Sequence, residues 1–271
     1  MVKFYSTSYN YDYSFPAVSL AYFLRYPNPY STHVLSTDVI DRYFDPETQR
    51  MTTVRLHLKR SKLPTAVVKL LPKSMLGASS DGNSTSYILE RSTIDIKEGW
   101  MKTENKNMDW TAVLSVIESQ EYRRPGGALT GESTNPLQQA ARETTNVTTT
   151  VALRSHIGEN IRKRRARLAE AAASDADNQP TMGFFKSWTT GSIQRSVELI
   201  GLRRAEGAQP KAKEGMRVVL ERLRDGGLVG VLEGMRRDRE LVFARQGDWK
   251  VQSDEIASAS SSAPDIDWRG D

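Results

Sequence analysis

The sequence predicts an α+β protein built on an antiparallel β-sheet. From residue 32 to residue 155, segments rich in β-branched and aromatic residues follow one another, separated by clusters of turn-forming residues. Consecutive strands without a core helix between them form antiparallel sheets. Helical periodicity occurs in two places, near the N-terminus and after about residue 187. We therefore expect one sheet, preceded by a short helix and followed by a long helical segment.

The chain is expected to open with a strand and a helix. Residues 2–13 are rich in Tyr, Phe and Ser, which favours a strand. Residues 15–25 predict a short helix, because Pro16 occupies the first turn and apolar residues follow at helical spacing up to Arg25. The run "YPNP" then ends the helix. Arg25 is thus placed at the end of an apolar helix.

The next two segments, 32–44 and 50–60, predict a hairpin around the turn "DPETQ". The second strand alternates, with Val54, Leu56 and Leu58 on one face and Thr53, Arg55, His57 and Lys59 on the other. We expect this second, basic face to turn partly toward the interior of the protein. Further strands are expected at 85–96, 100–108, 111–122 and 144–155.

The segments between and after the strands differ in character. Residues 62–84 are too apolar for a solvent loop and contain two prolines, so we expect them to cover another part of the protein. Two flexible insertions are expected, at about 123–141 and 157–180. Beyond them, two apolar stripes lie on either side of Pro210, which predicts a kinked long helix or two helices in line. We expect the domain to span residues 1–225, followed by a poorly ordered tail at 226–271.

Composition excludes several kinds of protein. The 271 residues include no cysteine, so disulfides, thiolate metal sites and cysteine nucleophiles are absent. No apolar run approaches the ~20 residues that cross a bilayer. The first residues have the features of neither a signal peptide nor a transit peptide, so no cleavable targeting segment is expected. A net charge of +5 suits a partner with phosphate or acidic groups, although such an excess is equally common in proteins without one.

Catalytic motifs are not found. The three histidines, His33, His57 and His156, are far apart and show no paired spacing with each other or with a carboxylate. We expect no enzyme activity, no cofactor and no metal site. For the basic run "RKRRAR" at 162–167, a solvated helix face is a better interpretation than a nuclear signal or a nucleic-acid patch. No nucleic-acid partner is expected.

The position of Arg25 has two interpretations. A buried arginine is costly unless an anion pairs with it, and a phosphate matches its planar donor fork. With the basic strand face nearby, Arg25 could therefore bind an anionic ligand. The alternative is an ordinary salt bridge from Arg25 to Asp38 or Asp41, which composition alone slightly favours.

Three stretches give the sequence a family resemblance: "RYPNPYSTHVLSTDVI", "TTVRLHLKRSKLP" and "ILERSTIDIKEGWM". They resemble the PRELI/MSF1 family of lipid-transfer proteins of the mitochondrial intermembrane space. The likeness covers residues 1–122 well and the segments 144–155 and 187–224 more loosely. It implies a START-like fold, in which a curved sheet of about seven strands encloses a lipid pocket with a long C-terminal helix and an apolar lid loop. The implied cargo is one anionic phospholipid.

The resemblance also implies site residues. Arg25 matches the arginine that meets the head-group phosphate at the floor of the family's pocket, and the other implied phosphate-binding positions are His33, Lys59, Lys62, Lys211 and Lys213. The lid, residues 63–77, is expected to contact the membrane through Leu63, Val67, Lys69, Leu70, Leu71, Lys73, Met75 and Leu76. Its apolar side chains would enter the bilayer while its lysines meet anionic head groups.

The expected function is transfer of phosphatidic acid from the outer to the inner mitochondrial membrane, for cardiolipin synthesis. Phosphatidylserine is the alternative cargo. The resemblance implies the intermembrane space as the location, and a small twin-CX9C helical-hairpin protein as the partner. A second hypothesis is a protein-binding adaptor that transfers no lipid and docks through "RKRRAR".

Overall fold

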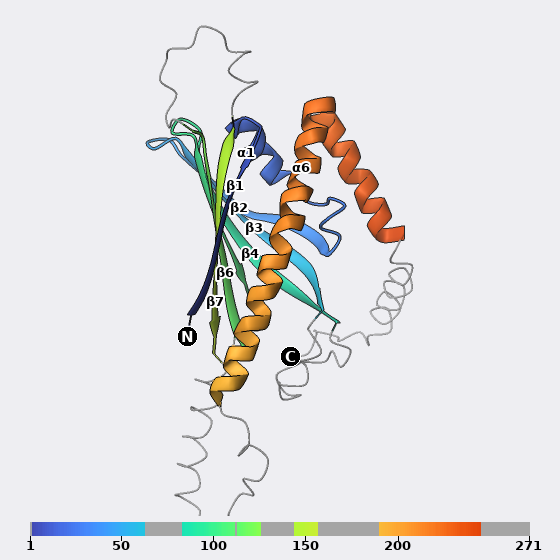
Figure 1. Ribbon diagram of the computed structural model, residues 1–271. Helices are drawn as coiled ribbons and strands as arrows, with labels where there is room; N and C mark the ends of the chain where they lie inside the picture. Colours follow the sequence, from blue (N-terminus) through green and yellow to red (C-terminus); the bar gives the residue numbers. More distant parts are fainter. Residues whose placement is uncertain (1, 63–82, 112, 126–143, 157–189, 245–271) are drawn as a thin grey trace, which may run out of the picture.

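A computed structural model describes residues 2–62, 83–111, 113–125, 144–156 and 190–244. Its central element is one seven-stranded antiparallel sheet, curved around a long helix that crosses its concave face (Figure 1). The strands are β1 (Val2–Tyr11), β2 (Val34–Asp45), β3 (Arg50–Lys62), β4 (Asn83–Asp95), β5 (Trp100–Asn107), β6 (Leu114–Arg123) and β7 (Thr145–Ser155). The helices are α1 (Phe15–Phe23) and α6 (Thr190–Ala244). The α+β fold class and the number of strands expected from the sequence are confirmed.

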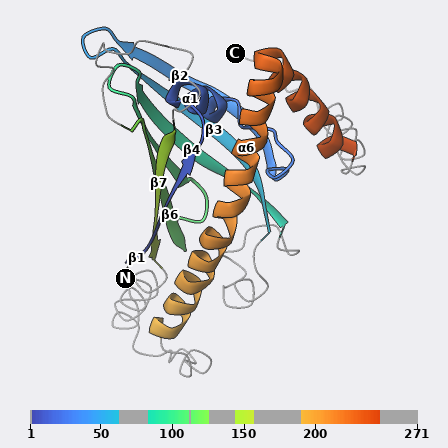
Figure 2. The same cartoon turned by 45° about the horizontal axis from the view of Figure 1, so that its top comes forward.

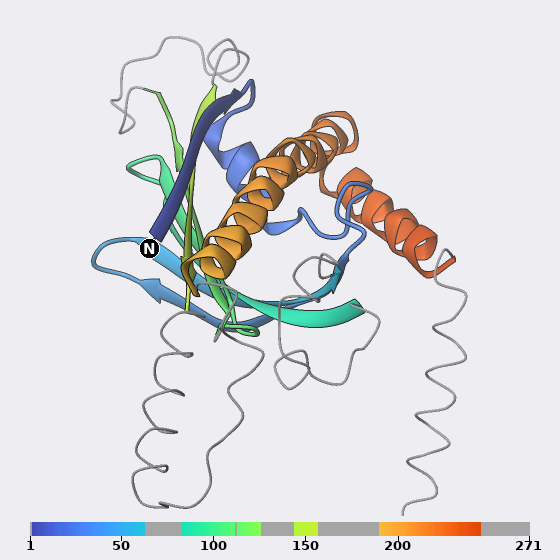
Figure 3. The same cartoon turned by 60° about the horizontal axis from the view of Figure 1, so that its bottom comes forward.

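The strand order is β1-β7-β6-β5-β4-β3-β2. Strands β2 to β7 therefore form a meander, in which each strand pairs with the next in the chain, and β1 joins the meander at β7. The two edges of the sheet are β1 and β2, and the sheet stays open between them. This opening leaves the concave face accessible to the helices, as a view from below makes plain (Figure 3).

Helix α1 fills the space between one end of the sheet and α6 (Figure 2). Most residues of α1 are apolar; Phe15, Val18, Ala21 and Tyr22 are buried, whereas Pro16 and Leu20 are exposed. The main core joins α1, the sheet and α6 through buried side chains: Tyr11, Phe15, Val18, Ala21, Tyr22, Ile94, Met101, Tyr122, Val147, Met216, Val219, Leu220 and Val231. The end of α1 is thus fixed against the inner face of the sheet.

The C-terminal segment differs from the sequence-based expectation in two places. The helix runs through Pro210, and its backbone leaves helical geometry at Gly227 instead, with φ 59° and ψ −155°. Pro210 is exposed, so the carbonyl left without an amide partner by the proline is able to bond water. The chain after Gly227 is helical up to Ala244, where the sequence predicted a poorly ordered tail from residue 226.

The returning helix is held by packing and by one ion pair. Val231 is fully buried in the main core. Arg222 donates to both carboxylate oxygens of Asp238, at 2.6 and 3.2 Å. These contacts join segments on opposite sides of the turn at Gly227. The local sequence pattern on either side of this turn therefore does not reveal them.

Candidate functional site

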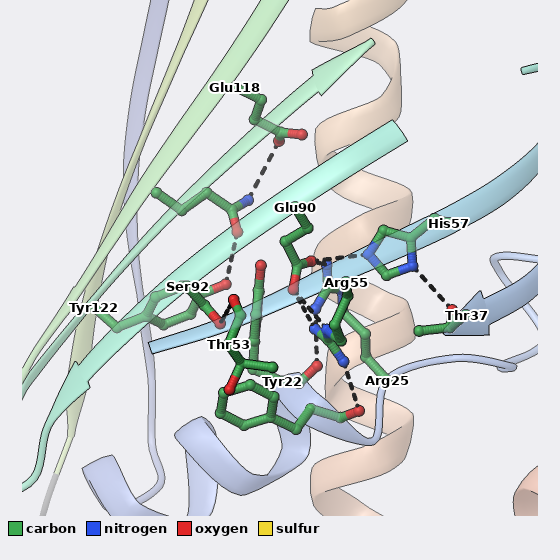
Figure 4. A network of polar contacts seen from close by, with 12 residues as sticks. Tyr22, Arg25, Thr37, Thr53, Arg55, His57, Glu90, Ser92, Glu118 and Tyr122 are labelled. Atoms are coloured by element: carbon green, nitrogen blue, oxygen red, sulfur yellow. Dashed lines mark hydrogen bonds and ion pairs between the residues drawn. The ribbon is translucent and has the colours of Figure 1, made fainter. Parts of the chain in front are cut away.

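Arg25, Arg55 and His57 converge on the carboxylate of Glu90 (Figure 4). Arg55 contacts oxygen Oε1 twice, through Nε at 2.7 Å and Nη2 at 2.6 Å. The other oxygen, Oε2, accepts from Arg25 Nη2 and lies 3.1 Å from His57 Nε2. All four side chains are buried or nearly so, with Arg25 the most accessible at 12%.

Sheet register assembles this cluster. Arg55 and His57 lie on the same face of β3, two residues apart. Glu90 of β4 is the register partner of Arg55, and Thr37 of β2 is the partner of His57. The basic face of β3 is therefore turned inward, with Arg55 3% exposed and His57 fully buried, which confirms the orientation expected for these residues.

Arg25 reaches the cluster from the end of α1. Its Nη1 donates to the carbonyl oxygen of Tyr22 at 2.8 Å, and Arg55 Nη1 donates to that of Phe23 at 2.9 Å. Both guanidinium groups thus bond carbonyls in the last turn of α1, where the helix dipole favours cations. These bonds position Arg25 between the helix and the sheet.

Aromatic rings cover the arginine. The Cζ atom of Arg25 lies 3.7 Å from the ring centroid of Tyr22 and 4.5 Å from that of Tyr26. Lys59 Nζ approaches the same Tyr26 ring, at 5.9 Å. A second cation from β3 is therefore close to Arg25, with the Tyr26 ring beside both.

The protonation states within the cluster follow from its contacts. Burial alone would raise the pKa of Glu90, but Arg25, the His57 hydrogen bond and Arg55 hold it well below the ordinary value. Burial lowers the pKa of His57, with Arg25 and Lys59 acting in the same direction. The neutral ring then donates from Nε2 to Glu90 and accepts at Nδ1 from the hydroxyl of Thr37, 2.9 Å away.

Positive charge exceeds negative charge in this region. Two guanidinium groups face one carboxylate, with Lys59 beside them and His57 neutral. The pKa of Tyr26 is lowered although burial would raise it, because the charges of Arg25 and Lys59 favour the phenolate. This region therefore attracts anions.

A second polar group lies on the same face of the sheet. Gln209 of α6 donates to Glu118 of β6 at 2.9 Å. On the sheet, Gln120 donates to the same carboxylate at 3.3 Å and accepts from the Tyr122 hydroxyl at 2.8 Å. In Figure 4, no dashed line joins Glu118 to Arg25 or Glu90. The concave face thus carries a second carboxylate whose hydrogen-bond partners are amides.

The structure brings some of the predicted phosphate-binding residues together. Loss of hydration, followed by the charges of Lys59, Arg204 and Lys211, lowers the pKa of His33 to about 4. His33 is nevertheless exposed, and its carbonyl oxygen accepts from the amide of Arg60 at 2.7 Å. His33 therefore lies next to Lys59, which is close to Arg25, and the charge of Lys211 acts on its ring.

The other predicted residues are placed differently. Lys213 lies on the side of α6 that faces β1, with its Nζ 5.0 Å from the ring centroid of Tyr9. Lys62 is the last residue of β3, and its side chain lies outside the described part of the chain. The lid at 63–77 and the run at 162–167 lie outside the described residues.

The alternative salt bridge expected for Arg25 is wrong in its partner. Asp38 and Asp41 are exposed on β2, and Arg25 pairs with Glu90. The sequence did not reveal Glu90 as the partner, because it is 65 residues away in the chain. A signal did exist: "ILERST" places one carboxylate on the strand that follows the basic one, and opposite charges favour cross-strand pairing. Only the register shows which residue it faces.

The described residues contain neither a cluster arranged as a metal site nor a helix suited to crossing a membrane. No group of three or more His, Asp or Glu side chains there is arranged to hold a metal ion. No helix there combines the length and apolar character needed to cross a membrane.

Comparison with known proteins gives one family and several relatives. The model of the PRELI-like family matches residues 16–164. The protein named ups1 homolog of Schizosaccharomyces pombe is 42% identical over 109 residues, which are 40% of this chain and 57% of that protein. Protein UPS1, mitochondrial, of Saccharomyces cerevisiae is 38% identical over 123 residues, 45% of this chain and 65% of the relative.

A human relative and a solved structure complete the comparison. PRELI domain-containing protein 1, mitochondrial, of Homo sapiens is 30% identical over 122 residues, 45% of this chain and 52% of the relative. The matches thus span between about half and two thirds of these relatives' lengths. The crystal structure of the Zhui aromatase/cyclase from a Streptomyces species aligns with a TM-score of 0.42 at 8% identity, covering 84% of this chain and 99% of the other.

Proposed function

Because the chain belongs to the PRELI-like family, we propose that it transfers one anionic phospholipid between the two mitochondrial membranes. The proposed cargo is phosphatidic acid, delivered for cardiolipin synthesis. The proposed location is the mitochondrial intermembrane space, in agreement with the mitochondrial names of the relatives. No catalytic step is part of this proposal.

One observation carries the proposal: at the end of α1, two arginines and a lysine surround a single carboxylate, Glu90. Such a cluster has positive charge left over, and burial makes that charge costly unless an anion binds. Arginine presents its donors in a planar fork, which suits the oxygens of a phosphate. A phospholipid offers this group on a chain-bearing molecule that must be shielded from water during transfer.

Charge also favours phosphatidic acid over phosphatidylserine. A terminal phosphate carries a charge of about −1.5 to −2 near neutral pH, whereas the phosphate of a diester head group carries one negative charge. Lys59 lies beside the arginine cluster and adds a further cation, and Lys211 adds positive charge near His33, whose own ring is neutral because its pKa is lowered to about 4. Phosphatidylserine remains the second candidate, since its phosphate and carboxylate are also anionic.

Two experiments test the cargo. Native mass spectrometry of the purified protein identifies any lipid that it retains, and phosphatidic acid is the expected species. Transfer between donor and acceptor liposomes should be faster for phosphatidic acid than for phosphatidylcholine. Equal transfer of the two lipids, or transfer of neither, contradicts the proposal. Preferred transfer of phosphatidylserine selects the second candidate.

The lid and the protein partner belong to the proposal as well. We propose that residues 63–77 close over the cargo or enter the membrane, and that a small twin-CX9C protein binds the folded domain. Deleting residues 66–74 should abolish transfer without unfolding the sheet, as followed by circular dichroism. If that deletion transfers lipid at the normal rate, the lid has no gating role. If neither the deletion nor the intact chain transfers lipid while the partner still binds, the adaptor hypothesis is favoured.

A further inference from the structure

Glu90 is the one carboxylate that both buried arginines contact in the described part of the chain. The family resemblance implies phosphate-binding positions among the cations, and Glu90 is a buried anion between them. A carboxylate at this point resembles a phosphate in two respects: it is negatively charged, and its oxygens accept from the arginine fork. We propose that Glu90 is an internal substitute for the lipid phosphate, and that Arg25 exchanges between these two anions as cargo enters and leaves.

The contacts of Glu90 identify Arg25 as the group that exchanges. Oxygen Oε1 is bound by Arg55 alone, through two nitrogens, and Arg55 is 3% exposed. Oxygen Oε2 is shared between Arg25 and His57. If Arg25 turns to another anion, each Glu90 oxygen keeps a donor. If Arg55 leaves, Oε1 loses every contact that the structure shows for it.

The surroundings of Arg25 also suit exchange. Arg25 is the most accessible of the four side chains, and Lys59 lies beside the same Tyr26 ring. An incoming phosphate would therefore meet Lys59 and Arg25 before the fully buried groups. The Arg25 bond to the Tyr22 carbonyl uses Nη1, so Nη2 is the nitrogen that changes partner.

This exchange has a consequence for transfer. A carrier must release its cargo at the acceptor membrane, and a buried cation that loses its anion is costly. Glu90 re-pairs with Arg25 at that moment, which lowers the cost of release. The inference rests on the proposed function, because it assigns a role in cargo release to a residue of the same site.

The test compares two carboxylate-to-amide variants. Glu90→Gln keeps the size of the side chain but removes the charge that competes for Arg25. Glu118→Gln makes the same change on the same face of the sheet, at a carboxylate whose partners in the structure are Gln209 and Gln120. Purified proteins loaded with fluorescent phosphatidic acid are mixed with acceptor vesicles, and the rate of release is measured.

We expect Glu90→Gln to slow release about tenfold, the size appropriate to removing one charged hydrogen-bonding competitor, and Glu118→Gln to match the unmodified protein. Release of Glu90→Gln at the unmodified rate overturns the inference, as does a folded Glu90→Gln protein that retains no lipid. If the unmodified protein itself retains no lipid, the proposed function fails. Retention by the unmodified protein with no effect of Glu90→Gln overturns the exchange alone.

A second measurement decides the matter if Glu90→Gln does not fold. Arginine side-chain NMR resonances of the unmodified protein are followed during titration with dioctanoyl phosphatidic acid. A shift of the Arg25 resonance with Arg55 unmoved supports the exchange, and a shift of both or of neither overturns it. A parallel titration with inorganic phosphate identifies the source of the anion: a shift with lipid alone indicates a lipid head group, and a shift with both indicates a site that accepts any phosphate.

Discussion

Gly215 of α6 lies directly against the side chain of Asn28. A Cβ atom at Gly215 would be 2.7 Å from Asn28 Oδ1 and 2.9 Å from Nδ2. Asn28 is 2% exposed, its Nδ2 donates to the carbonyl oxygen of Arg25 at 2.6 Å, and its Oδ1 accepts from the amide of Tyr30 at 2.9 Å. The long helix thus contacts the turn that carries Arg25, and it does so where α6 has no side chain.

Gly215→Ala should therefore destabilise the protein, although alanine is the better helix former. The added methyl group must displace Asn28, whose two polar atoms are both bonded, and such overpacking costs about 1–3 kcal/mol. Gly207 is the matched control: it is exposed, lies in the same helix, and a Cβ atom added there would meet open space. Gly207→Ala should raise the free energy of unfolding by up to about 1 kcal/mol. Urea unfolding measures both changes, and equal effects of the two substitutions would contradict the assigned contact.

Replacing Arg55 should cost more stability than replacing Arg25. Arg55→Gln leaves Glu90 Oε1 without its contacts, and removal of one partner from a buried ion pair costs about 3–5 kcal/mol. In Arg25→Gln, His57 still binds the oxygen that Arg25 leaves. Thermal and urea unfolding of the two variants check this order. A larger loss in Arg25→Gln would mean that Arg25 is the principal structural partner of Glu90.

The stability of the protein should fall as the pH drops below 6.5. Burial lowers the pKa of His57 in the folded protein, whereas in the unfolded chain the ring titrates near its ordinary value of 6.5. The unfolded state then binds more protons in this range, so the free energy of unfolding decreases with decreasing pH. Urea unfolding at about pH 7.5 and about pH 5.5 measures the decrease, and His57→Gln should reduce it. His33, whose pKa is also lowered, adds to the decrease, so a free energy of unfolding that is unchanged between these values would show that both rings take up protons in the folded state.

Glu90 should add a second, more acidic loss of stability. Its pKa in the folded protein lies well below the ordinary 4.5, because Arg25, His57 and Arg55 stabilise the carboxylate against the effect of burial. The contribution of a carboxylate with a lowered pKa is fully present above the unfolded value and is lost as the pH falls through the folded one. The acid-unfolding midpoint followed by circular dichroism should therefore be less acidic in Arg55→Gln than in the unmodified protein. Coincident midpoints would contradict the assigned pairing.

Of the two adjacent glycines at this turn, only Gly227 should be needed for its conformation. Gly227 has φ 59° and ψ −155°, a conformation that costs other residues of order 1–3 kcal/mol. Gly227→Ala should therefore loosen the helix at 228–244, which hydrogen exchange measures as faster exchange of its amides. Gly226 lies next to it, without a positive φ and with open space around it. Gly226→Ala should leave the exchange rates unchanged, and equal effects of the two substitutions would contradict the prediction.

Local sequence patterns were enough to predict most elements of the fold. Strand-like segments, their turns and the short helix from residue 15 are properties of local pattern, and all seven strands and α1 lie within a few residues of their expected positions. Alternation separated the basic face of β3 from its apolar face, because successive side chains of a strand point to opposite faces, and the structure confirms that the basic face is the inward one. The end of the domain did not follow, since Val231 and Asp238 are fixed by contacts with residues across the Gly227 turn.

Arg25 was identified from the sequence, but its partner was decided by the tertiary structure. Asp38 and Asp41 are nearer in the chain, yet both are exposed on β2, while Glu90 reaches Arg25 because β4 pairs with β3 and places it opposite Arg55. Strand register depends on which face of each strand is buried in the assembled sheet, and a shift of one residue would turn Glu90 to the other face of the sheet. The charge balance at Arg25, on which the proposed anion binding and exchange depend, is therefore a property of the assembled sheet and of no single segment.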